Sequence, residues 1–371
     1  MKRNMKIAII GANESINILI KKAKEMGYET HVFAWECGDP GEKTADFFYP
    51  IDVANKEEIL KICKTLNIDG VASITSDFAV NTVNYVARNL GLISNSEKTD
   101  LVARNKYLMR KALKEAGVYT PWFEKADINT DLSFMKNHKF PVIVKPTDRW
   151  SSKGVTRVNN YNDLREAVYY AASESLTNEA IIEDFMSGNE YSAECICQNG
   201  VCNILAITEK ATTGYPNYVE KGHIQPANIP EEYVEIIKDK IKKAVLALDI
   251  KNSAAHAEFK LFDNNEVGII EIGARMGGDF IGTDLVRLST GYDYVGMVVD
   301  VSCGNKIDYS KKEKYSKVKV NFILNQFDLD KYKILEETSK KIIKRAVIYS
   351  TDFSHKVKNS SDRYGYYITA E

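Results

Sequence analysis

AAHAEFKLFDNNEVGIIEIGARMGGD, residues 254–279, is the stretch that decides the fold of this chain. Two apolar runs flank Asn264-Asn265, and asparagine tolerates the positive φ that tight turns require. The pattern therefore predicts a β-hairpin. If its turn centres between these asparagines, Glu258 lies directly opposite Glu271, with Cβ atoms about 4.5–5.5 Å apart.

Alternation along the two strands divides their side chains between a polar and an apolar face. The polar face is predicted to carry His256, Glu258, Lys260, Glu271, Gly273 and Arg275. The apolar, core-facing side is predicted to carry Ala255, Ala257, Phe259, Leu261, Ile270, Ile272 and Ala274. A register slip of one residue would destroy the pairing of the glutamates.

Two facing carboxylates repel each other unless a cation neutralises them. Mg²⁺ prefers oxygen ligands, and in nucleotide sites one or two carboxylates hold it together with substrate phosphates. Glu258 and Glu271 are therefore candidate metal ligands, and Arg275 can offer a forked cation to a phosphoryl group. In the structural alternative, Glu258 pairs with Lys260 or Arg275 on a solvated sheet face.

Composition argues against several classes of function. Lys+Arg and Asp+Glu number 50 and 51, which gives no general electrostatic case for nucleic acid. No apolar run approaches the roughly 20 residues that span a membrane, and IAII near the N-terminus predicts a first strand rather than a secretory signal. The six cysteines match neither paired zinc motifs nor a disulfide scaffold, so we expect a reducing cytoplasm.

Strands and helices alternate along residues 5–95. KIAIIGA, THVFAW and DGVASITS predict strands, and INILIKKAKEMG, EEILKICKTLN and DFAVNTVNYVARNLG predict helices. This order predicts a parallel sheet covered on both faces. The turn at Gly11 invites a dinucleotide-binding interpretation, but positions 13 and 16 are Asn and Ile, so the three-glycine fingerprint is missing. A dehydrogenase remains an alternative only if this sheet binds NAD.

From residue 96 onward the regular alternation of strands and helices ends. A helical stretch is expected over 96–117, interrupted near Arg104, followed by short, mostly antiparallel strands. These strands are expected at 141–145, 154–158, 180–185, 190–198 and 201–208. A helix over 229–249, the hairpin, a strand at 317–324, a helix at 330–344 and two closing strands complete the prediction. The fold class is therefore α/β followed by α+β.

Two further segments could bind a nucleotide. In KFPVIVKPTDRWSSKGV, Lys145 ends a strand, and Ser151, Ser152 and Gly154 offer donors in the loop that follows. In IIEDFMSGNEYSAE, an extended backbone could meet an adenine edge, with Phe185 or Met186 packing on the ring. Ordinary hairpins explain either segment alone, and no Walker A pattern is present.

Taken together and in this order, the segments resemble the ATP-grasp superfamily over nearly the whole chain. The resemblance rests on NKYLMRKALKEAGVYTP, PVIVKPTDRWSSKGV, IIEDFMSGNEYS, HAEFK, IIEIGARMGGD and SSDRYGYYITA. It implies a pre-ATP-grasp α/β domain at 1–95, an ATP-grasp domain at 96–305 with a lid at about 119–185, and a C-terminal part of the catalytic domain at 306–371.

The resemblance also implies roles for individual residues. Lys106 and Lys145 resemble phosphate-binding lysines, and Arg275 resembles an arginine that stabilises the intermediate. Glu258 and Glu271 match metal ligands for Mg²⁺, for which Mn²⁺ can substitute. The remaining ATP-binding residues implied are Ser151, Ser152, Lys153 and Gly154 in a flexible phosphate loop, Glu183 and Met186 at the adenine hinge with Phe185 nearby, and Glu190 as the ribose ligand. One departure is Gly273, where many members of the family carry Asn.

The implied activity is an ATP-dependent carboxylate–amine ligase that works through an acyl phosphate on small molecules such as amino acids. His223 lies in the segment 217–230, which resembles one that lines the substrate pocket of amino-acid ligases, and is a candidate to bind the carboxylate or act as a base, or else an ordinary surface-loop histidine. His256 is a second candidate for the substrate site, or a side chain that hydrogen-bonds a glutamate. Other ATP-grasp chemistry and a non-catalytic ATP sensor remain alternatives. A homodimer is compatible with the resemblance, whereas nucleic-acid and membrane partners are not expected.

Overall fold

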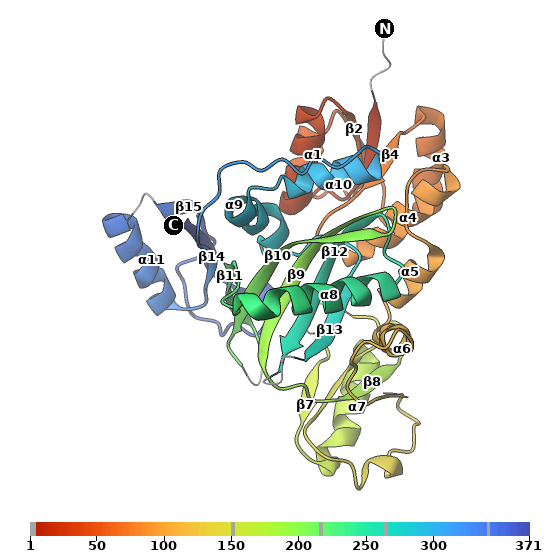
Figure 1. Cartoon of the computed structure of the whole chain (residues 1–371), viewed down its shortest axis with the longest axis vertical. Coiled ribbons are helices and arrows are strands. Elements are labelled where there is room, and N and C mark those ends of the chain that lie inside the picture. The colour runs from red at the N-terminus through yellow and green to blue at the C-terminus, as the bar shows by residue number, and fades with distance from the viewer. Residues whose placement is uncertain (1–4, 150–152, 215–217, 263–265, 340–341) are drawn as a thin grey trace.

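The computed structural model describes residues 5–149, 153–214, 218–262, 266–339 and 342–371. Within these ranges the chain forms one parallel and two largely antiparallel sheets (Figure 1). The parallel sheet comes first in the chain, and the two antiparallel sheets follow it. The predicted combination of an α/β part and an α+β part is therefore confirmed.

The N-terminal sheet has four parallel strands in the order β3-β2-β1-β4. They are β1 (Lys6–Ile10), β2 (Glu29–Ala34), β3 (Phe47–Pro50) and β4 (Gly70–Ala72). The helices between them are α1 (Glu14–Glu25), α2 (Pro40–Thr44), α3 (Lys56–Leu66) and α4 (Asp77–Asn89). Apolar clusters cover both faces of the sheet, as the alternation predicts. Strand β3 and helix α2 are not predicted from the sequence.

One covering helix of this sheet comes from much later in the chain. Helix α10 (Tyr294–Ser302) lies beside α1 (Figure 1) and shares its apolar cluster. The N-terminal sheet is thus packed against the part of the chain that carries the glutamate hairpin. Helices α5 (Glu97–Val102) and α6 (Lys106–Glu115) continue the chain, separated by the break predicted near Arg104.

A small antiparallel sheet follows, in the order β5-β8-β6-β7. Its strands are β5 (Phe123–Ala126), β6 (Val142–Pro146), β7 (Thr156–Val158) and β8 (Ala180–Asp184). Helix α7 (Leu164–Glu174) packs on it through a separate apolar cluster. This helix is absent from the sequence-based expectation. In Figure 1 the small sheet projects from the body of the molecule.

The large sheet has eight strands in the order β13-β12-β9-β10-β11-β14-β16-β15. Its strands are β9 (Asn189–Gln198), β10 (Val201–Thr212), β11 (Glu220–Gln225), β12 (Ser253–Leu261), β13 (Val267–Gly273), β14 (Val318–Ile323), β15 (Ile343–Ile348) and β16 (Gly365–Ala370). Its helical segments are α8 (Glu231–Ala247), the π-helical turn Ile281–Leu285, α9 (Val286–Thr290) and α11 (Gln326–Ser339). The expected helix over 330–344 is wrong at its end, because Ile343 already begins β15.

The glutamate hairpin has the predicted pairing of Glu258 with Glu271, but its register is not uniform along the two strands. Glu258 pairs with Glu271, whereas Phe259 pairs with Ile269, so the register shifts by one residue between Glu258 and Phe259. Asn264 and Asn265, on which the prediction was centred, lie outside the described residues. Ile270 is the extra residue of a β-bulge. Glu258 therefore lies opposite Glu271, although the residues nearer the turn pair in a register shifted by one.

The bulge corrects one assignment of faces. Ile270 was predicted to face the core, but it lines the site cavity, and its place in the core is taken by Ile269 and Val267. The other residues predicted for the apolar face pack in or against the same core cluster. The domain boundaries at 95 and 305, and the limits of the lid, stay predictions.

Candidate active site

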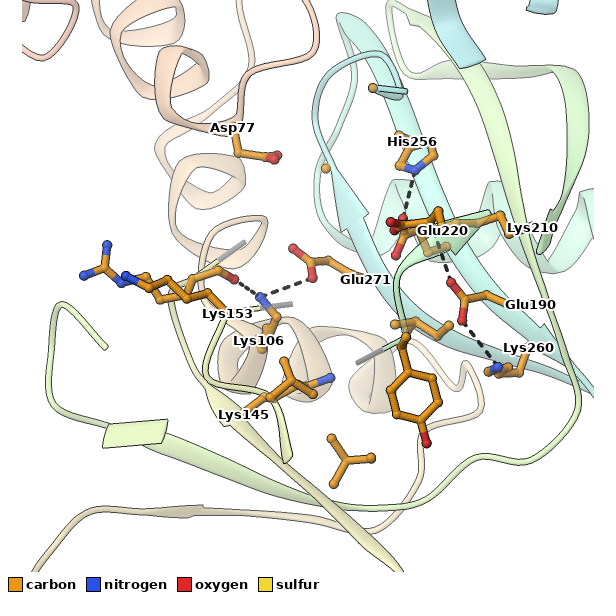
Figure 2. A pocket seen from close by; sticks show the side chains of 18 of the residues that line it. Asp77, Lys106, Lys145, Lys153, Glu190, Lys210, Glu220, His256, Lys260 and Glu271 are labelled. Atoms are coloured by element: carbon orange, nitrogen blue, oxygen red, sulfur yellow. Dashed lines mark hydrogen bonds and ion pairs between the residues drawn. The ribbon is translucent and has the colours of Figure 1, made fainter. Parts of the chain in front are cut away.

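A cavity of about 440 Å³ opens where the three sheets meet. Figure 2 shows its charged side chains converging from the small sheet, the large sheet and the start of α4. Twelve of the predicted site residues line it: Lys106, Lys145, Lys153, Glu183, Phe185, Met186, Glu190, His223, His256, Glu258, Glu271 and Arg275. Sequence patterns and the family resemblance therefore identify twelve residues that the fold brings together in one cavity.

The other predicted residues of the phosphate loop are Ser151, Ser152 and Gly154. Ser151 and Ser152 lie outside the described residues, and Gly154 is not among the described residues that line the cavity. Gly154 is buried at φ +75°, and a Cβ there would lie 2.6 Å from Cγ of Pro146. The structure therefore gives Gly154 a conformational reason to be glycine, and a role in ATP binding stays a prediction.

Lys106 lies at the start of α6, directly after the break that separates α5 from α6. Its ammonium is 3.2 Å from Oε2 of Glu271 and donates to the carbonyl oxygen of Arg149. The backbone N–H of Lys106 also donates to the carbonyl oxygen of Thr147. The lysine is therefore held between the small sheet and the glutamate hairpin, as the dashed contact in Figure 2 shows.

Lys145 and Glu183 form a buried charged cluster with Arg110. Oε2 of Glu183 is 2.6 Å from Nζ of Lys145, and its Oε1 accepts a hydrogen bond of 2.6 Å from Nε of Arg110. Burial raises the pKa of the Glu183 carboxyl, but the neighbouring cations outweigh it and lower the pKa to about 2. Two cations share one carboxylate, so the cluster can attract a phosphate group.

Glu183 was expected at the adenine hinge, and its side chain is instead committed to these ion pairs. Phe185 and Met186 follow it at the cavity wall. The guanidinium of Arg157 lies 4.4 Å from the centre of the Phe185 ring. A Cβ at Gly268 would lie 2.7 Å from Sδ of Met186, so Met186 packs close to β13. The adenine role of this segment stays a prediction.

Glu258 pairs with Lys210 rather than with Lys260 or Arg275, which were its partners in the structural alternative. Nζ of Lys210 lies 2.6 Å from Oε1 of Glu258 and 3.1 Å from Oε1 of Glu190. Lys260 lies 3.4 Å from the other oxygen of Glu190. Burial lowers the pKa of Lys210, but the carboxylates of Glu258 and Glu190 outweigh it and raise the pKa.

No sequence pattern identifies Lys210 or Arg110 as a residue of the site. Each lies in an ordinary strand or helix with no motif around it, and only the packing of distant elements shows its partner. Lys210 lies near the end of β10, and Arg110 lies in α6.

The two facing glutamates have the donor chemistry that Mg²⁺ requires. Their oxygens lie beside the ammonium groups of Lys210 and Lys106, which shows that the site attracts cations. Among the residues that the structure describes, no three His, Cys, Asp or Glu side chains form a set that could hold a metal ion alone. The pair therefore fits a divalent cation that also takes oxygens from a bound phosphate.

His256 lies behind Glu258 with both ring nitrogens occupied. Nε2 is 3.2 Å from Oε1 of Glu258, and Nδ1 contacts Oε1 of the fully buried Glu194. Burial lowers the pKa of His256, but the two carboxylates raise it to about 9. The geometry matches the expectation that His256 hydrogen-bonds a glutamate. A substrate role for it stays untested.

Arg275 is held by a residue that the sequence did not single out. Its Nε and Nη2 donate to the two carboxylate oxygens of Asp77, over 3.0 and 2.6 Å. Asp77 is the first residue of α4, in the N-terminal part of the chain. A forked ion pair therefore joins the N-terminal part to the glutamate hairpin.

The other end of the cavity has its own charged cluster. His223 is buried with its Nε2 3.5 Å from Oδ2 of Asp279, and neither ring nitrogen makes a hydrogen bond in the described part of the chain. Arg363 donates to both carboxylate oxygens of Asp279, over 2.8 and 2.9 Å, and to Glu220 over 2.9 Å. Burial raises the pKa of Asp279, but His223 and Arg363 outweigh it and lower the pKa.

Arg363 was not predicted, although it lies in SSDRYGYYITA, one of the segments that carry the resemblance. Its guanidinium lies 3.6 Å from the centre of the Phe322 ring.

Among the described residues, no helix is long and apolar enough to cross a membrane.

Residues 138–284 match the family model described as the ATP-grasp domain. The chain is 27% identical over 273 residues to alanine–anticapsin ligase of Bacillus subtilis, which covers 67% of this chain and 57% of that protein. It is 27% identical over 276 residues to D-alanine–D-alanine ligase of Flavobacterium johnsoniae, with 70% and 82% of the two chains covered. The match thus spans little more than half the length of the first of these relatives.

Solved structures show the same fold. The L-amino acid ligase of Bacillus licheniformis superimposes with a TM-score of 0.83 at 23% identity, covering 100% of this chain and 94% of that one. Phosphoribosylglycinamide synthetase of Anaerococcus prevotii gives a TM-score of 0.78 at 23% identity with the same coverage. The likeness therefore extends over the full length of this chain, beyond residues 138–284.

Proposed function

Because residues 138–284 of this chain form an ATP-grasp domain, we propose that the protein is an ATP-dependent carboxylate–amine ligase that forms an amide through an acyl phosphate. The observation that carries the proposal is the facing pair Glu258 and Glu271, in one cavity with Lys106, Lys145 and Arg275. The named relatives that join alanine to a second substrate support the reaction class.

ATP is assigned to the end of the cavity near the small sheet. Lys106 and Lys145 supply cations for its phosphates, and the exposed Lys153 can approach them from the loop. Lys210 is added to this group, since its ammonium lies between the metal-site glutamate and Glu190. Phe185 and Met186 are assigned to the adenine, and Glu190 to the ribose.

Glu258 and Glu271 would hold Mg²⁺, or Mn²⁺ in its place. The ion would neutralise charge on the phosphates and on the phosphoryl group as it is transferred. The neighbouring side chains keep the carboxylates in place, with His256 and Lys210 on Glu258 and Lys106 on Glu271. Because these side chains already balance the charge of the carboxylates, the ion would compete with them for, or share, the same negative charge.

In the first step, a carboxylate oxygen of the substrate attacks the γ-phosphorus of ATP. The bond from that phosphorus to the bridging oxygen of ADP breaks, and ADP leaves as the acyl phosphate forms. Lys106, Lys145 and Lys210 line the same cavity and would stabilise charge on the transferring group. Closing the small sheet over the cavity would exclude water, which hydrolyses an acyl phosphate.

In the second step, the amine nitrogen attacks the acyl carbon and phosphate leaves. Arg275 is assigned to the developing oxyanion. The proton that the amine loses is assigned to His223, whose ring faces Asp279 at the far end of the cavity. That end, with Glu220, Asp279 and Arg363, offers both signs of charge, which suits zwitterionic substrates such as amino acids.

The test is ADP release by the full chain with Mg²⁺-ATP across amino acids and small carboxylates, supplied singly and in pairs. We expect ADP only with a particular acid and amine together, an amide in the product by mass spectrometry, and no ADP with Glu271→Gln. A phosphorylated product without amide, or dependence on bicarbonate, would indicate other ATP-grasp chemistry. Tight ATP binding with no turnover of any pair would indicate a sensor. A cytoplasmic location and a homodimer stay predictions.

A further inference from the structure

The ion pair between Asp77 and Arg275 crosses between two parts of the molecule. Arg275 comes from the turn after β13, whereas Asp77 begins α4 of the N-terminal part, and Figure 2 shows Asp77 reaching toward the cavity from its own helix. The two side chains are mostly buried, with 16% and 12% of their surface exposed. Nη1 of Arg275 also donates to the carbonyl oxygen of Met276 over 3.3 Å, so all three guanidinium nitrogens are engaged.

The backbone before Asp77 is built to aim it. Thr75 lies at φ +58°, a conformation that β-branched residues rarely adopt, and it lines the same cavity. Ser76 then caps α4, its Oγ accepting the backbone N–H of Ala79 over 3.3 Å. A sharp turn followed by a capped helix start therefore directs the Asp77 carboxylate into the cavity.

Gly273 leaves the space that the ion pair occupies. A Cβ at this position would lie 2.8 Å from Oδ1 of Asp77 and 3.1 Å from both Cζ and Nε of Arg275. Contacts this short require the ion pair to shift. Gly273 also lies two residues beyond Glu271 on the same strand, so a side chain here would stand between the glutamate and the arginine.

Arg275 has competing partners nearby. Glu258 and Glu271 line the same cavity as Arg275 and Asp77. Burial lowers the pKa of Arg275, but the carboxylates of Asp77, Glu258 and Glu271 outweigh it and raise the pKa. Without Asp77, the guanidinium would be free to move onto the carboxylates of the metal site. Asp77 therefore keeps the cation and the metal-site carboxylates apart.

We propose that Asp77 is a positioning residue for Arg275, and that Gly273 is required because only glycine leaves room for this ion pair. The inference rests on the proposed ligase function. It follows that an amide side chain introduced by Gly273→Asn displaces Arg275 and does not act as an additional metal ligand.

The experiment compares Asp77→Asn, Gly273→Asn and Gly273→Ala in the full chain. The matched control is Lys22→Gln, which breaks the ion pair of 3.0 Å that joins α1 to Asp293 at the start of α10. We expect all three site variants to lower kcat for ADP release at least about tenfold while KM for ATP changes less than about threefold, as misplacement of a transition-state group predicts. Lys22→Gln should leave both constants unchanged.

A second measurement does not need turnover. Phenylglyoxal modifies arginines that are free of ion pairs, and peptide mass spectrometry reports the rate at Arg275. We expect faster modification of Arg275 in the three site variants than in the parent chain or in Lys22→Gln. If the parent chain releases no ADP with any substrate pair, the ligase proposal fails, and the labelling still decides whether Asp77 holds Arg275.

Direct Mn²⁺ binding, followed by electron paramagnetic resonance, completes the test. Gly273→Asn should bind Mn²⁺ no more tightly than the parent chain. The positioning role is overturned by unchanged kcat in Asp77→Asn, by unchanged labelling of Arg275, or by tighter Mn²⁺ binding with faster turnover in Gly273→Asn. The role would also be overturned if the site variants and Lys22→Gln lost the same thermal stability and kcat fell no more than KM for ATP changed. Such a result would indicate an ion pair that only stabilises the fold.

Discussion

The ammonium of Lys210 lies 2.6 Å from a carboxylate oxygen of Glu258, the residue assigned to the metal site. The side chain of Lys210 is only 4% exposed, and its other close partner is Glu190. A buried cation in contact with a proposed metal ligand stabilises that carboxylate when no other cation is present. Lysine and metal are therefore expected to compete for, or share, the same negative charge.

Lys210→Met should destabilise the protein, because it leaves buried carboxylates without their cation. The expected loss in the free energy of unfolding is about 3 kcal/mol in EDTA. Millimolar Mg²⁺ should restore more of the stability of this variant than of the parent chain. Urea denaturation with and without Mg²⁺ measures both effects.

Lys260→Met is the control for this comparison, because Lys260 lies 3.4 Å from Glu190 and its side chain is more exposed. Its cost should stay below about 1 kcal/mol. Equal Mg²⁺ stabilisation of the parent and Lys210→Met chains would contradict the shared-charge interpretation.

Glu258→Gln and Glu271→Gln should each weaken Mn²⁺ binding, since an amide oxygen is a poorer ligand for a hard cation than a carboxylate. We expect at least about a tenfold rise in the dissociation constant by water-proton relaxation. EDTA should stop ADP release, and excess Mg²⁺ should restore it. Glu220→Gln, at the other end of the cavity, is the control and should keep the parent affinity; a comparable loss there would show that binding depends on overall charge.

Glu183 should make stability depend on acidity over a defined window. Its pKa is lowered from 4.5 to about 2 by the ion pairs with Arg110 and Lys145. Since the folded pKa is below the unfolded one, the stabilisation is present above pH 4.5 and is lost as the pH falls toward 2. The free energy of unfolding of the parent chain should therefore fall across this window.

Glu183→Gln should be less stable at pH 7 by about 3 kcal/mol, because two buried cations lose their counter-ion. The slope of its free energy of unfolding against pH should also be shallower, by the equivalent of about one proton taken up on unfolding. Urea denaturation at several pH values gives both numbers. Glu232→Gln, which alters an exposed carboxylate in the first turn of α8, should reproduce the parent slope; a shallower slope in that control would refute the assignment to Glu183.

Gly277→Ala should destabilise the chain through Glu194 and His256. A Cβ at Gly277 would lie 2.5 Å from Oε1 of Glu194 and 2.6 Å from Nδ1 of His256. Forced overpacking of this kind costs about 1–3 kcal/mol. Differential scanning calorimetry should show a lower Tm.

Gly278→Ala is matched to this variant in position and in chemistry, and no heavy atom lies within 4 Å of its added Cβ. Its Tm should stay close to that of the parent chain. Equal Tm values for both variants would mean that the Glu194–His256 pair is free to move aside.

Local patterns were sufficient to predict the framework. The alternation of strands and helices over residues 5–95 predicts the parallel sheet, and the period-two pattern around Glu258 predicts its pairing with Glu271. These predictions succeed because turn residues and side-chain periodicity act between neighbours in the chain. The prediction for Ile270 fails because a one-residue bulge, which has no sequence signal here, turns it to the opposite face.

The sequence by itself thus determined most of the strands and helices, though not β3, α2 or α7, and it identified twelve of the residues that line the cavity. Only the tertiary structure decided how those charges are neutralised. Lys210, Arg110 and Asp77 are ordinary residues of a strand and two helices, and each becomes part of the site through a partner at least 48 positions away. Burial makes an unpaired charge costly, so each partner is selected by proximity in the folded chain, which no local pattern records.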